Sequence, residues 1–506
     1  MRQFTFLVLV GIFISICSCR SDFETVASNG DLAFSKDTIF LDTVFSTIGS
    51  STYTLKVYNN SKNDVNIPTI KLGERLNSKY RMTVDGMTGK QGKEFENITL
   101  LAKDSIYIFI ETTATTADAN PTDFLYTDNI EFDSGTNQQK IALVTLIKDA
   151  VFLYPQKLNN GTTETVTLDG EETYGFFLNE NDPINGNELK FTNQKPYVIY
   201  GYATVPEGKT VTFDAGARVH FHANSGLIIS KDATLKINGT TSTTETLEGE
   251  VIFEGDRLEP LYSDIPGQWG TIWLRNETKN NSINHLTLKN ATVGLLIENN
   301  LVTTMPIKNT QIYDCTNYGI LAKNAKIEGE NIVINSSGVA SLACNYGGDY
   351  KFTHCTFNNN WNGNSPTSVS VNNFELGETP EAKNLTKATF NNCIIYGSYS
   401  NHLSLSKKDG ATFEYIFNNC LIKSSDSSTN PLYKITTDPV HYNAIILNKD
   451  PGFYKPTFNN FNIDNSSSAF AKGNTTYLIP MDINGATRTL PPDLGAYQSK
   501  DFPKKL

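Results

Sequence analysis

The chain has 506 residues, enough for two or three compact domains or for one long repetitive domain with a smaller one. Apolar residues make up 39% and charged residues 19%, which is low for a compact globule and typical of a chain rich in corners and exposed strand faces. The formal net charge of −11 disfavours nucleic acid and polyanionic glycans as main partners.

The start of the chain predicts export and lipid anchoring. A basic residue precedes the apolar run FTFLVLVGIFISI, which has the length of a signal-peptide core and is too short to span a membrane. The run ends in Ile16-Cys17-Ser18-Cys19, an arrangement that matches a bacterial lipobox with Cys19 as the lipidated residue. Cys17 fits less well because Ile16 would directly precede it. An ordinary secretory signal with incidental cysteines is the alternative.

These features set the first boundaries and a location. We expect a lipoprotein signal peptide over residues 1–19 and a short tether over residues 20–30. A lipidated Cys19 would anchor the protein to a membrane. The predicted location is the cell envelope, as an outer membrane lipoprotein that faces the periplasm or the cell surface.

Residues 31–150 predict a β-sandwich of immunoglobulin-like type. Runs such as TIFLDTVF, STYTLKVYNN and KIALVTLIKD make about seven strands, separated by turn signals that include Asp85-Gly86 and Ser134-Gly135. The segment has no cysteine, so no disulfide joins its sheets. We expect a spacer, or a cap for the first coil of the following domain; a binding role is the alternative.

Residues 151–458 predict a solenoid of short strands. Apolar residues alternate with polar ones, as at Val211 and Phe213 or Leu235 and Ile237, and glycines such as Gly216 and Gly239 lie between the runs. The connections are too short for crossover helices. Winding such one-faced strands into stacked coils buries them at the lowest cost.

The runs VPEGKTVTFDAGARVHF, DATLKING, VIFEGD and PGQWGTIWL resemble right-handed parallel β-helix repeat proteins, the pectin-lyase-like solenoids. With the lipobox, the resemblance is to β-helix lipoproteins of Gram-negative bacteria that carry an N-terminal immunoglobulin-like domain. It implies an all-β fold, with a β-sandwich before a right-handed parallel β-helix. It leaves function open, because that fold hosts lyases, hydrolases, binding proteins and proteins without activity.

Residues 459–506 resemble the closing segment of such proteins, which caps the solenoid. The matching positions are Asp482, Gly485, Arg488, Asp493, Gly495 and Tyr497. An aspartate and an arginine in facing loops can pair and fasten the last coil.

Four cysteines hold similar places in successive repeats: Cys315, Cys355, Cys393 and Cys420. Stacked coils would align them as buried, reduced thiols. A metal site or disulfides are the alternative. No C-x-x-C spacing supports a zinc site.

The solenoid offers few parts for catalysis. No arginine occurs between Arg275 and Arg488, and the aspartates are scattered. His354 with Asp349 is a weak catalytic candidate, and a histidine on a strand is more often structural. His220 and His222 could form half of a metal site, but no third ligand is evident, so a surface pair is expected. We predict no metal and no cofactor.

The tryptophans divide into two groups. Trp269 and Trp273 belong to the fold motif and are expected to pack against the solenoid. Trp361 lies in NNNWNGN, where no apolar neighbour would bury it, so it is a glycan-contact candidate; packing of that loop onto the solenoid is the alternative.

The main functional prediction is a lipid-anchored cell-envelope β-helix protein without catalytic activity. It would display a face that binds a polysaccharide, another glycan or an envelope component. One alternative is a polysaccharide lyase or glycoside hydrolase on the same fold. The other is a structural or adhesive surface protein.

Overall fold

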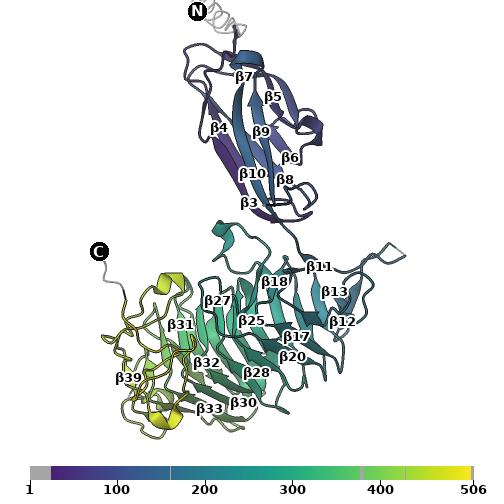
Figure 1. Cartoon of the computed structure of the whole chain (residues 1–506). Helices are drawn as coiled ribbons and strands as arrows, with labels where there is room; N and C mark the ends of the chain where they lie inside the picture. The colour runs from purple at the N-terminus through teal and green to yellow at the C-terminus, as the bar shows by residue number, and fades with distance from the viewer. Residues whose placement is uncertain (1–23, 123, 160, 376–380, 428, 503–506) are drawn as a thin grey trace, which may run out of the picture. The chain divides into compact units, whose positions relative to one another are not determined.

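The computed structural model describes residues 24–122, 124–159, 161–375, 381–427 and 429–502. The chain divides at Asp149/Ala150 into two compact units (Figure 1). The expectation of an all-β protein is confirmed, since the helices of the described residues are three-residue 3-10 turns. These turns are η1 (Arg75–Asn77), η2 (Gly135–Asn137), η3 (Pro260–Tyr262), η4 (Pro431–Tyr433), η5 (Pro456–Phe458) and η6 (Thr475–Tyr477).

Cys19 lies outside the described residues, so its lipidation stays a prediction. Within the described ranges, no helix has the length and apolar character needed to cross a membrane.

The first unit contains two sheets. One has the order β1 (Val26–Ala27), β5 (Val65–Leu72), β9 (Leu125–Phe132), β10 (Gln139–Lys148) and β3 (Thr38–Phe45), with β7 (Glu94–Leu100) paired to β5. The other has the order β2 (Ala33–Phe34), β4 (Tyr53–Tyr58), β8 (Ser105–Thr112) and β6 (Tyr80–Val84). Strand alternation directs residues such as Ile67 and Ile130 from the first sheet, and Leu55 and Ile108 from the second, into one buried cluster.

The second unit is built on two long sheets whose strands alternate along the chain. The 11-stranded sheet has the order β11 (Val151–Leu153), β15 (Tyr197–Ile199), β18 (Arg218–Phe221), β21 (Val251–Gly255), β24 (Leu286–Lys289), β27 (Gln311–Cys315), β29 (Val333–Ser337), β31 (Thr356–Asn359), β34 (Ile394–Gly397), β37 (Leu421–Ile422) and β39 (Ile446–Leu447).

The 18-stranded sheet holds two strands of most passes. Its order is β12 (Thr165–Leu168), β13 (Glu171–Phe177), β14 (Lys190–Phe191), β16 (Tyr202–Val205), β17 (Thr210–Asp214), β19 (Gly226–Ile229), β20 (Thr234–Asn238), β22 (Trp269–Leu274), β23 (Ser282–Asn284), β25 (Ala291–Glu298), β26 (Met305–Lys308), β28 (Tyr318–Glu330), β30 (Ala340–Thr353), β32 (Thr367–Asn372), β33 (Leu385–Asn391), β35 (Leu403–Ser406), β36 (Ile416–Asn418) and β38 (Tyr442–Asn443).

Successive passes pair in parallel and in register, with strands such as β25, β28 and β30 side by side (Figure 1). Leu295 pairs with Ile320, Ile320 with Leu342, and Leu342 with Val369, at separations of 25, 22 and 27 residues. These side chains are fully buried in one continuous core. The pattern suggests a β-helix-like solenoid, because each pass buries its apolar side chains on the pass before it.

The core contains the predicted thiol ladder in a corrected form. Three cysteines are buried and free: Cys355, Cys393 and Cys420. Each directly precedes one of three residues that pair with one another on neighbouring strands, Thr356, Ile394 and Leu421. Burial raises the pKa of the Cys355 and Cys420 thiols, which keeps them protonated.

Cys315 does not belong to that ladder. It is also buried and free, but it pairs with Ser337. Val333 pairs with Thr356, so the position that precedes Thr356 corresponds to Ile332 in the pass before. The prediction that Cys315 aligns with the other three was therefore wrong. Similar residues flank all four cysteines, but Cys315 occupies a different position within its pass.

The closing segment lies along the outward side of the 11-stranded sheet. Its Ile483, Ala496 and Tyr497 cluster with Tyr313 and Val333. Its Ile463 and Leu494 cluster with outward residues of β34 and β37. Side chains of this sheet that point away from the core are thereby covered.

Arg488 fastens this segment through oxygens of amides rather than of aspartates. Its Nη2 donates to Asn331 Oδ1 at 2.9 Å and to the carbonyls of Gly495 and Ala496 at 3.1 Å. Among the described residues no ion pair joins Arg488 to Asp482 or Asp493, although both carboxylates favour its charge. The expected Asp–Arg pairing is thus replaced by hydrogen bonds to neutral groups.

Candidate functional site

A hollow of about 420 Å³ opens on the 18-stranded sheet near the start of the second unit. One wall is the hairpin of β12 and β13, whose two-residue turn is Asp169-Gly170 with φ of +51° and +92°. Both φ values suit the mirror-image turn that Asp-Gly favours in tight hairpins. Val166 and Leu168 of this hairpin pack onto Ile228 of β19.

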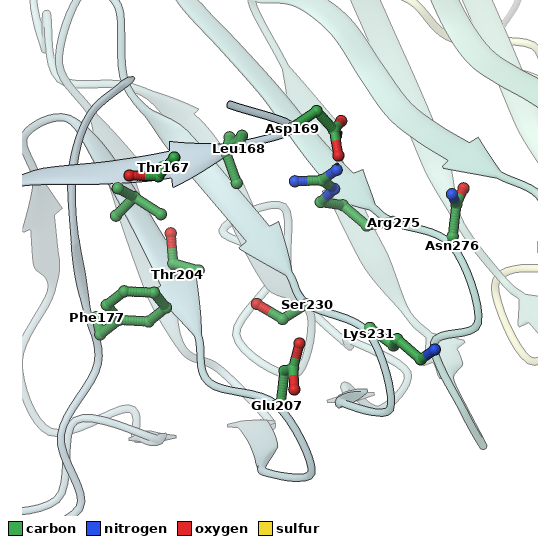
Figure 2. Close-up of a pocket in the computed structure, with 11 residues that line it drawn as sticks. Thr167, Leu168, Asp169, Phe177, Thr204, Glu207, Ser230, Lys231, Arg275 and Asn276 are labelled. Atoms are coloured by element: carbon green, nitrogen blue, oxygen red, sulfur yellow. Dashed lines mark ion pairs between the residues drawn. The ribbon is translucent and has the colours of Figure 1, made fainter. Parts of the chain in front are cut away.

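An ion pair closes the hairpin onto the sheet (Figure 2). Arg275 Nη2 lies 2.5 Å from Asp169 Oδ2, and the guanidinium also lies 5.0 Å from the ring centroid of Trp273. The indole Nε1 of Trp273 donates to Glu298 at 2.8 Å. The result is a polar wall with an aromatic ring held beside it.

The other walls of this hollow carry mixed chemistry. Phe177, half exposed at 50%, lies at one side, and Glu207, Ser230 and Lys231 lie at the other (Figure 2). Lys231 is paired with Glu277 at 2.7 Å. An exposed aromatic ring next to hydroxyl, carboxylate and ammonium groups can bind both the apolar face and the hydroxyls of a sugar.

Turn residues that follow the paired strands form a row along one corner of the unit. Ile229 pairs with Leu274, and Leu274 pairs with Ile297. The residues two positions later in the sequence, which are Lys231, Asn276 and Asn299, are therefore neighbours in space. The next pass adds Asn324, which follows Ala322, the partner of Ile297. Chemistry separated in sequence is therefore adjacent at this corner.

The asparagines of this row are bonded to one another. Asn299 Nδ2 donates to Asn276 Oδ1 at 3.1 Å, and Asn324 Nδ2 donates to Asn299 Oδ1 at 3.1 Å. With neighbouring strands about 4.8 Å apart, this amide ladder extends over roughly 10 Å. A primary amide has two donor hydrogens and an acceptor oxygen, so ladder bonding leaves further hydrogen-bonding capacity.

The ladder leads from the first hollow to a second one of about 560 Å³. Asn324, Lys326, Asp349 and Lys383 line this second hollow. Lys326 Nζ lies 3.7 Å from Asp349 Oδ2, and Lys383 Nζ lies 4.3 Å from the ring centroid of Tyr346. We call the two hollows and the ladder of Asn276, Asn299 and Asn324 the corner groove.

A third hollow, of about 720 Å³, lies near the last passes, and the segment 407–413 borders both it and the second hollow. Its floor includes Tyr415, on which the ring of His441 stacks at 4.4 Å. His441 Nδ1 lies 2.7 Å from Asp438 Oδ2. Burial raises the pKa of Asp438, but the hydrogen bonds and charge of His441, together with the backbone N–H of Val440, outweigh burial, so the net shift of the pKa is downward.

The predicted catalytic candidates lie apart in the structure. Asp349 lines the second hollow and faces Lys326. His354 is fully buried, and its Nε2 lies 3.1 Å from Asn392 Nδ2. Burial, with the nearby charge of Arg488, holds the pKa of His354 well below its usual range. A neutral, enclosed imidazole at this position fits a role in packing.

The three tryptophans lie in different environments. Trp361 is half buried in the turn after β31, and its ring lies close to Gly338. Trp269 is buried, and Trp273 is half exposed beside Arg275 but packs against the cluster of Val166, Leu168 and Ile228, so both pack against the second unit as expected. A register shift between Thr271 and Ile272 reverses the alternation within β22.

His220 and His222 do not form a surface pair. His220 is buried, with its Nδ1 3.3 Å from the carbonyl oxygen of Gly255. His222 is half exposed and contacts Asp256 at 2.7 Å, which raises its pKa. In the part of the chain that the structure describes, no group of three or more His, Cys, Asp or Glu side chains is arranged to hold a metal ion.

No protein-family model matches the chain, and a search of curated proteins finds no match. Among solved structures, an ASH/PapD-like domain of human CEP192 aligns over 26% of this chain and 96% of its own length, at 13% identity and a TM-score of 0.16. A family 123 glycoside hydrolase from Clostridium perfringens, described for glycolipid glycan hydrolysis, aligns over 24% of this chain at 11% identity and a TM-score of 0.16. The chain spans only 26% of that hydrolase. Likenesses this weak carry no argument about function.

Proposed function

We propose that this protein is a non-catalytic glycan-binding protein of the cell envelope, anchored by a lipid on Cys19. The second unit is taken as a right-handed parallel β-helix of the pectin-lyase-like type and the first as an immunoglobulin-like β-sandwich. Its partners are a membrane, through the anchor, and a polysaccharide or other glycan. The location is the outer membrane, on its periplasmic or its outer side.

One observation carries the binding role. The amide ladder of Asn276, Asn299 and Asn324 joins two hollows along one corner of the second unit. Amides in a row offer repeated donors and acceptors, and exposed Phe177 offers a ring for stacking. A long ligand with regularly spaced hydroxyls, such as a polysaccharide chain, fits this arrangement better than a compact ligand does.

The test is affinity gel electrophoresis of the full chain through gels that contain a soluble mixed-linkage β-glucan, galactomannan, dextran or polygalacturonate. The proposal expects retardation by at least one polysaccharide. Phe177→Ala should weaken that retardation about tenfold in Kd, as loss of one stacked ring does. Asn299→Leu, which interrupts the ladder, should act in the same direction.

The matched control is Phe458→Ala. Phe458 is an exposed phenylalanine of the second unit, at 78%, and it does not line the corner groove. Equal loss of retardation in Phe177→Ala and Phe458→Ala would remove the corner groove as the binding site. No retardation by any of the four polysaccharides would remove the proposed function.

Trp361 is a separate glycan-contact candidate. It lies in the turn between β31 and β32, outside the corner groove. In the same gels, Trp361→Ala should leave retardation unchanged if the corner groove holds the ligand. Loss of retardation in that variant alone would place the contact at Trp361 instead.

Catalysis as a lyase or hydrolase is the second candidate, and the third hollow favours it. A histidine held by a carboxylate, as His441 is by Asp438, can act as a general base. Release of unsaturated sugars or new reducing ends from the same polysaccharides, lost in His441→Ala, would establish this activity. His354 and Asp349 stay weaker candidates, and His354→Ala is the parallel variant.

Lipidation has its own test. Metabolic labelling with palmitate should mark the wild-type protein, and Cys19→Ala should abolish the label. Label retained in Cys19→Ala and lost in Cys17→Ala would move the anchor. If neither variant changes labelling, the membrane partner is excluded from the proposal. A structural or adhesive role would then be favoured if the gels also show no binding.

A further inference from the structure

We propose that the first unit contains a second carbohydrate site, on the outer face of β4, β6 and β8, which binds the flat face of a pyranose in an uncharged polysaccharide. This site is independent of the corner groove and goes beyond the function proposed above. It is formed by Lys56, Arg81, Tyr107, Phe109 and Glu111, which we call the aromatic platform.

The two rings of the platform are large, exposed and nearly parallel. Tyr107 is 46% exposed and Phe109 is 41% exposed. Their ring centroids lie 6.3 Å apart, with 15° between the ring planes. They alternate along β8 with Ile106, Ile108 and Ile110, which are buried in the core of the unit. Strand alternation therefore fixes both rings on the outer face.

A lysine holds the first ring in place. Lys56 of β4 lies opposite Tyr107 in the antiparallel register. Its Nζ lies 5.2 Å from the ring centroid of Tyr107 and 5.3 Å from that of Tyr58. A cation between two aromatic faces limits how the rings turn, so the platform is ordered before a ligand arrives.

A hollow of about 280 Å³ adjoins the second ring. Phe109, Arg81, Glu111 and Gln91 line it. Arg81 Nη2 lies 2.6 Å from Glu111 Oε2, and Arg81 Nε donates to the same oxygen at 2.9 Å. The hollow therefore presents a paired donor and acceptor beside a flat apolar ring, which is the combination that one sugar ring requires.

Charge decides which class of ligand fits. The Arg81–Glu111 pair cancels within the hollow, and Thr54 and Thr83 lie opposite Phe109 on the two neighbouring strands. The further charge of the platform is the single positive charge of Lys56, which lies against the rings of Tyr58 and Tyr107. A ligand with many charges of one sign would therefore find little opposite charge in the platform. β8 is paired on both sides, by β4 and β6, so its face rather than a strand edge is available. These facts favour an uncharged, hydroxyl-rich chain over an added β-strand of a partner protein.

The test uses the full chain in gels that contain mixed-linkage β-glucan, galactomannan or dextran, with polygalacturonate as the anionic comparison. Phe177→Ala provides a background in which the corner groove is weakened. In that background the proposal expects residual retardation by an uncharged polysaccharide. Adding Tyr107→Ala to this background should raise the Kd for that polysaccharide about tenfold. Adding Tyr107→Trp instead should leave the retardation in place.

Phe40→Ala is the matched control, because Phe40 is an exposed aromatic on β3 of the other sheet, at 66%. It should leave retardation unchanged, and the thermal midpoints of all variants should agree within a few degrees. A second readout separates the two sites. The three tryptophans, Trp269, Trp273 and Trp361, all lie in the second unit, so ligand bound at the platform should leave tryptophan emission unchanged.

Each outcome decides the proposal. Retardation that Tyr107→Ala leaves unchanged, or that only polygalacturonate causes, overturns the aromatic platform. Binding lost in Tyr107→Ala but not in Phe177→Ala supports the platform and removes the corner groove. Binding lost in Phe177→Ala alone supports the corner groove and removes the platform.

Discussion

Arg275 and Asp169 are 106 positions apart in the chain, and an ion pair of 2.5 Å joins them. Arg275 has a largely buried side chain, at 17% exposure, whereas Asp169 is 77% exposed at the tip of the β12–β13 hairpin. The pair thus ties a projecting hairpin to the sheet, and it forms the rim of the first hollow of the corner groove (Figure 2).

Arg275→Ala should loosen this hairpin without unfolding the unit. Because Asp169 is exposed, water screens the pair, and its loss should cost no more than about 1 kcal/mol. The contacts of Val166 and Leu168 with Ile228 remain. Hydrogen exchange should quicken in residues 165–177 and stay unchanged in β28 and β30. Lys231→Ala, which removes a different ion pair of the same hollow, is the control. Equal hydrogen exchange of residues 165–177 in Arg275→Ala and Lys231→Ala would show that the Arg275–Asp169 ion pair does not hold the hairpin.

Strand periodicity made the fold class predictable. Val211, Phe213, Leu235 and Ile237 alternate with polar residues in the sequence, and all four are buried in the structure. Alternation is a local property that follows from the two-residue repeat of a strand, so it can be read without knowledge of the partner strands.

The corner groove could not be predicted in the same way, because it depends on register. Asn276, Asn299 and Asn324 recur at separations of 23 and 25 residues, a signal that the sequence contains, yet only strand pairing places them side by side. The same limit applies to the face of β22 on which Trp273 lies. The register shift between Thr271 and Ile272 places its ring on the outer face. The pairing skips Gly294 of β25, and a glycine within a strand often marks such a bulge, but the sequence does not show which strand lies beside it.

Cys393 tests the buried thiol ladder. Cys393→Asp should destabilise the second unit by about 3–5 kcal/mol, because an unpaired charge would enter the core. Cys393→Ala should cost about 1–2 kcal/mol, the cost of a small cavity. Urea unfolding measures both. Native Cys355, Cys393 and Cys420 should also resist a bulky maleimide, and rapid labelling of all three would show that they are not enclosed.

Arg488 tests the fastening of the closing segment. Arg488→Met keeps most of the apolar stem but leaves the carbonyls of Gly495 and Ala496, and Asn331 Oδ1, without this donor. We expect a loss of about 2–4 kcal/mol in unfolding free energy, since buried acceptors lose a charged partner. Faster hydrogen exchange in residues 481–498 should accompany it. Lys472→Met, at an exposed position of the same segment, is the control. Equal urea midpoints for Arg488→Met and the wild type would show that packing alone holds the segment.

His402 predicts how the stability of the second unit depends on pH. The ring is fully buried; its Nε2 accepts the backbone N–H of Tyr399 at 2.9 Å, and its Nδ1 lies 3.0 Å from Ser368 Oγ. Ser368 Oγ in turn donates to the carbonyl of Tyr396 at 2.5 Å, so Nδ1 carries the hydrogen and the ring is neutral. Burial, and then the charge of Lys423, lowers the pKa of His402 to about 4.

The sign of the effect follows from linkage. The unfolded chain binds a proton on His402 near pH 6.5, whereas the folded chain binds it only near pH 4. The contribution of His402 to the free energy of unfolding is therefore complete above pH 6.5 and is lost as the pH falls from 6.5 to 4. The shift corresponds to roughly 3 kcal/mol. Urea unfolding should be measured at pH 7.5 and at pH 4. The unfolding free energy should fall less between these two pH values in His402→Gln than in the wild type. His354 remains in both proteins and contributes in the same direction, so only the difference between them reports on His402. Equal losses in the two proteins would mean that His402 is protonated in the folded state as readily as in the unfolded chain, which its hydrogen bond from Tyr399 should prevent.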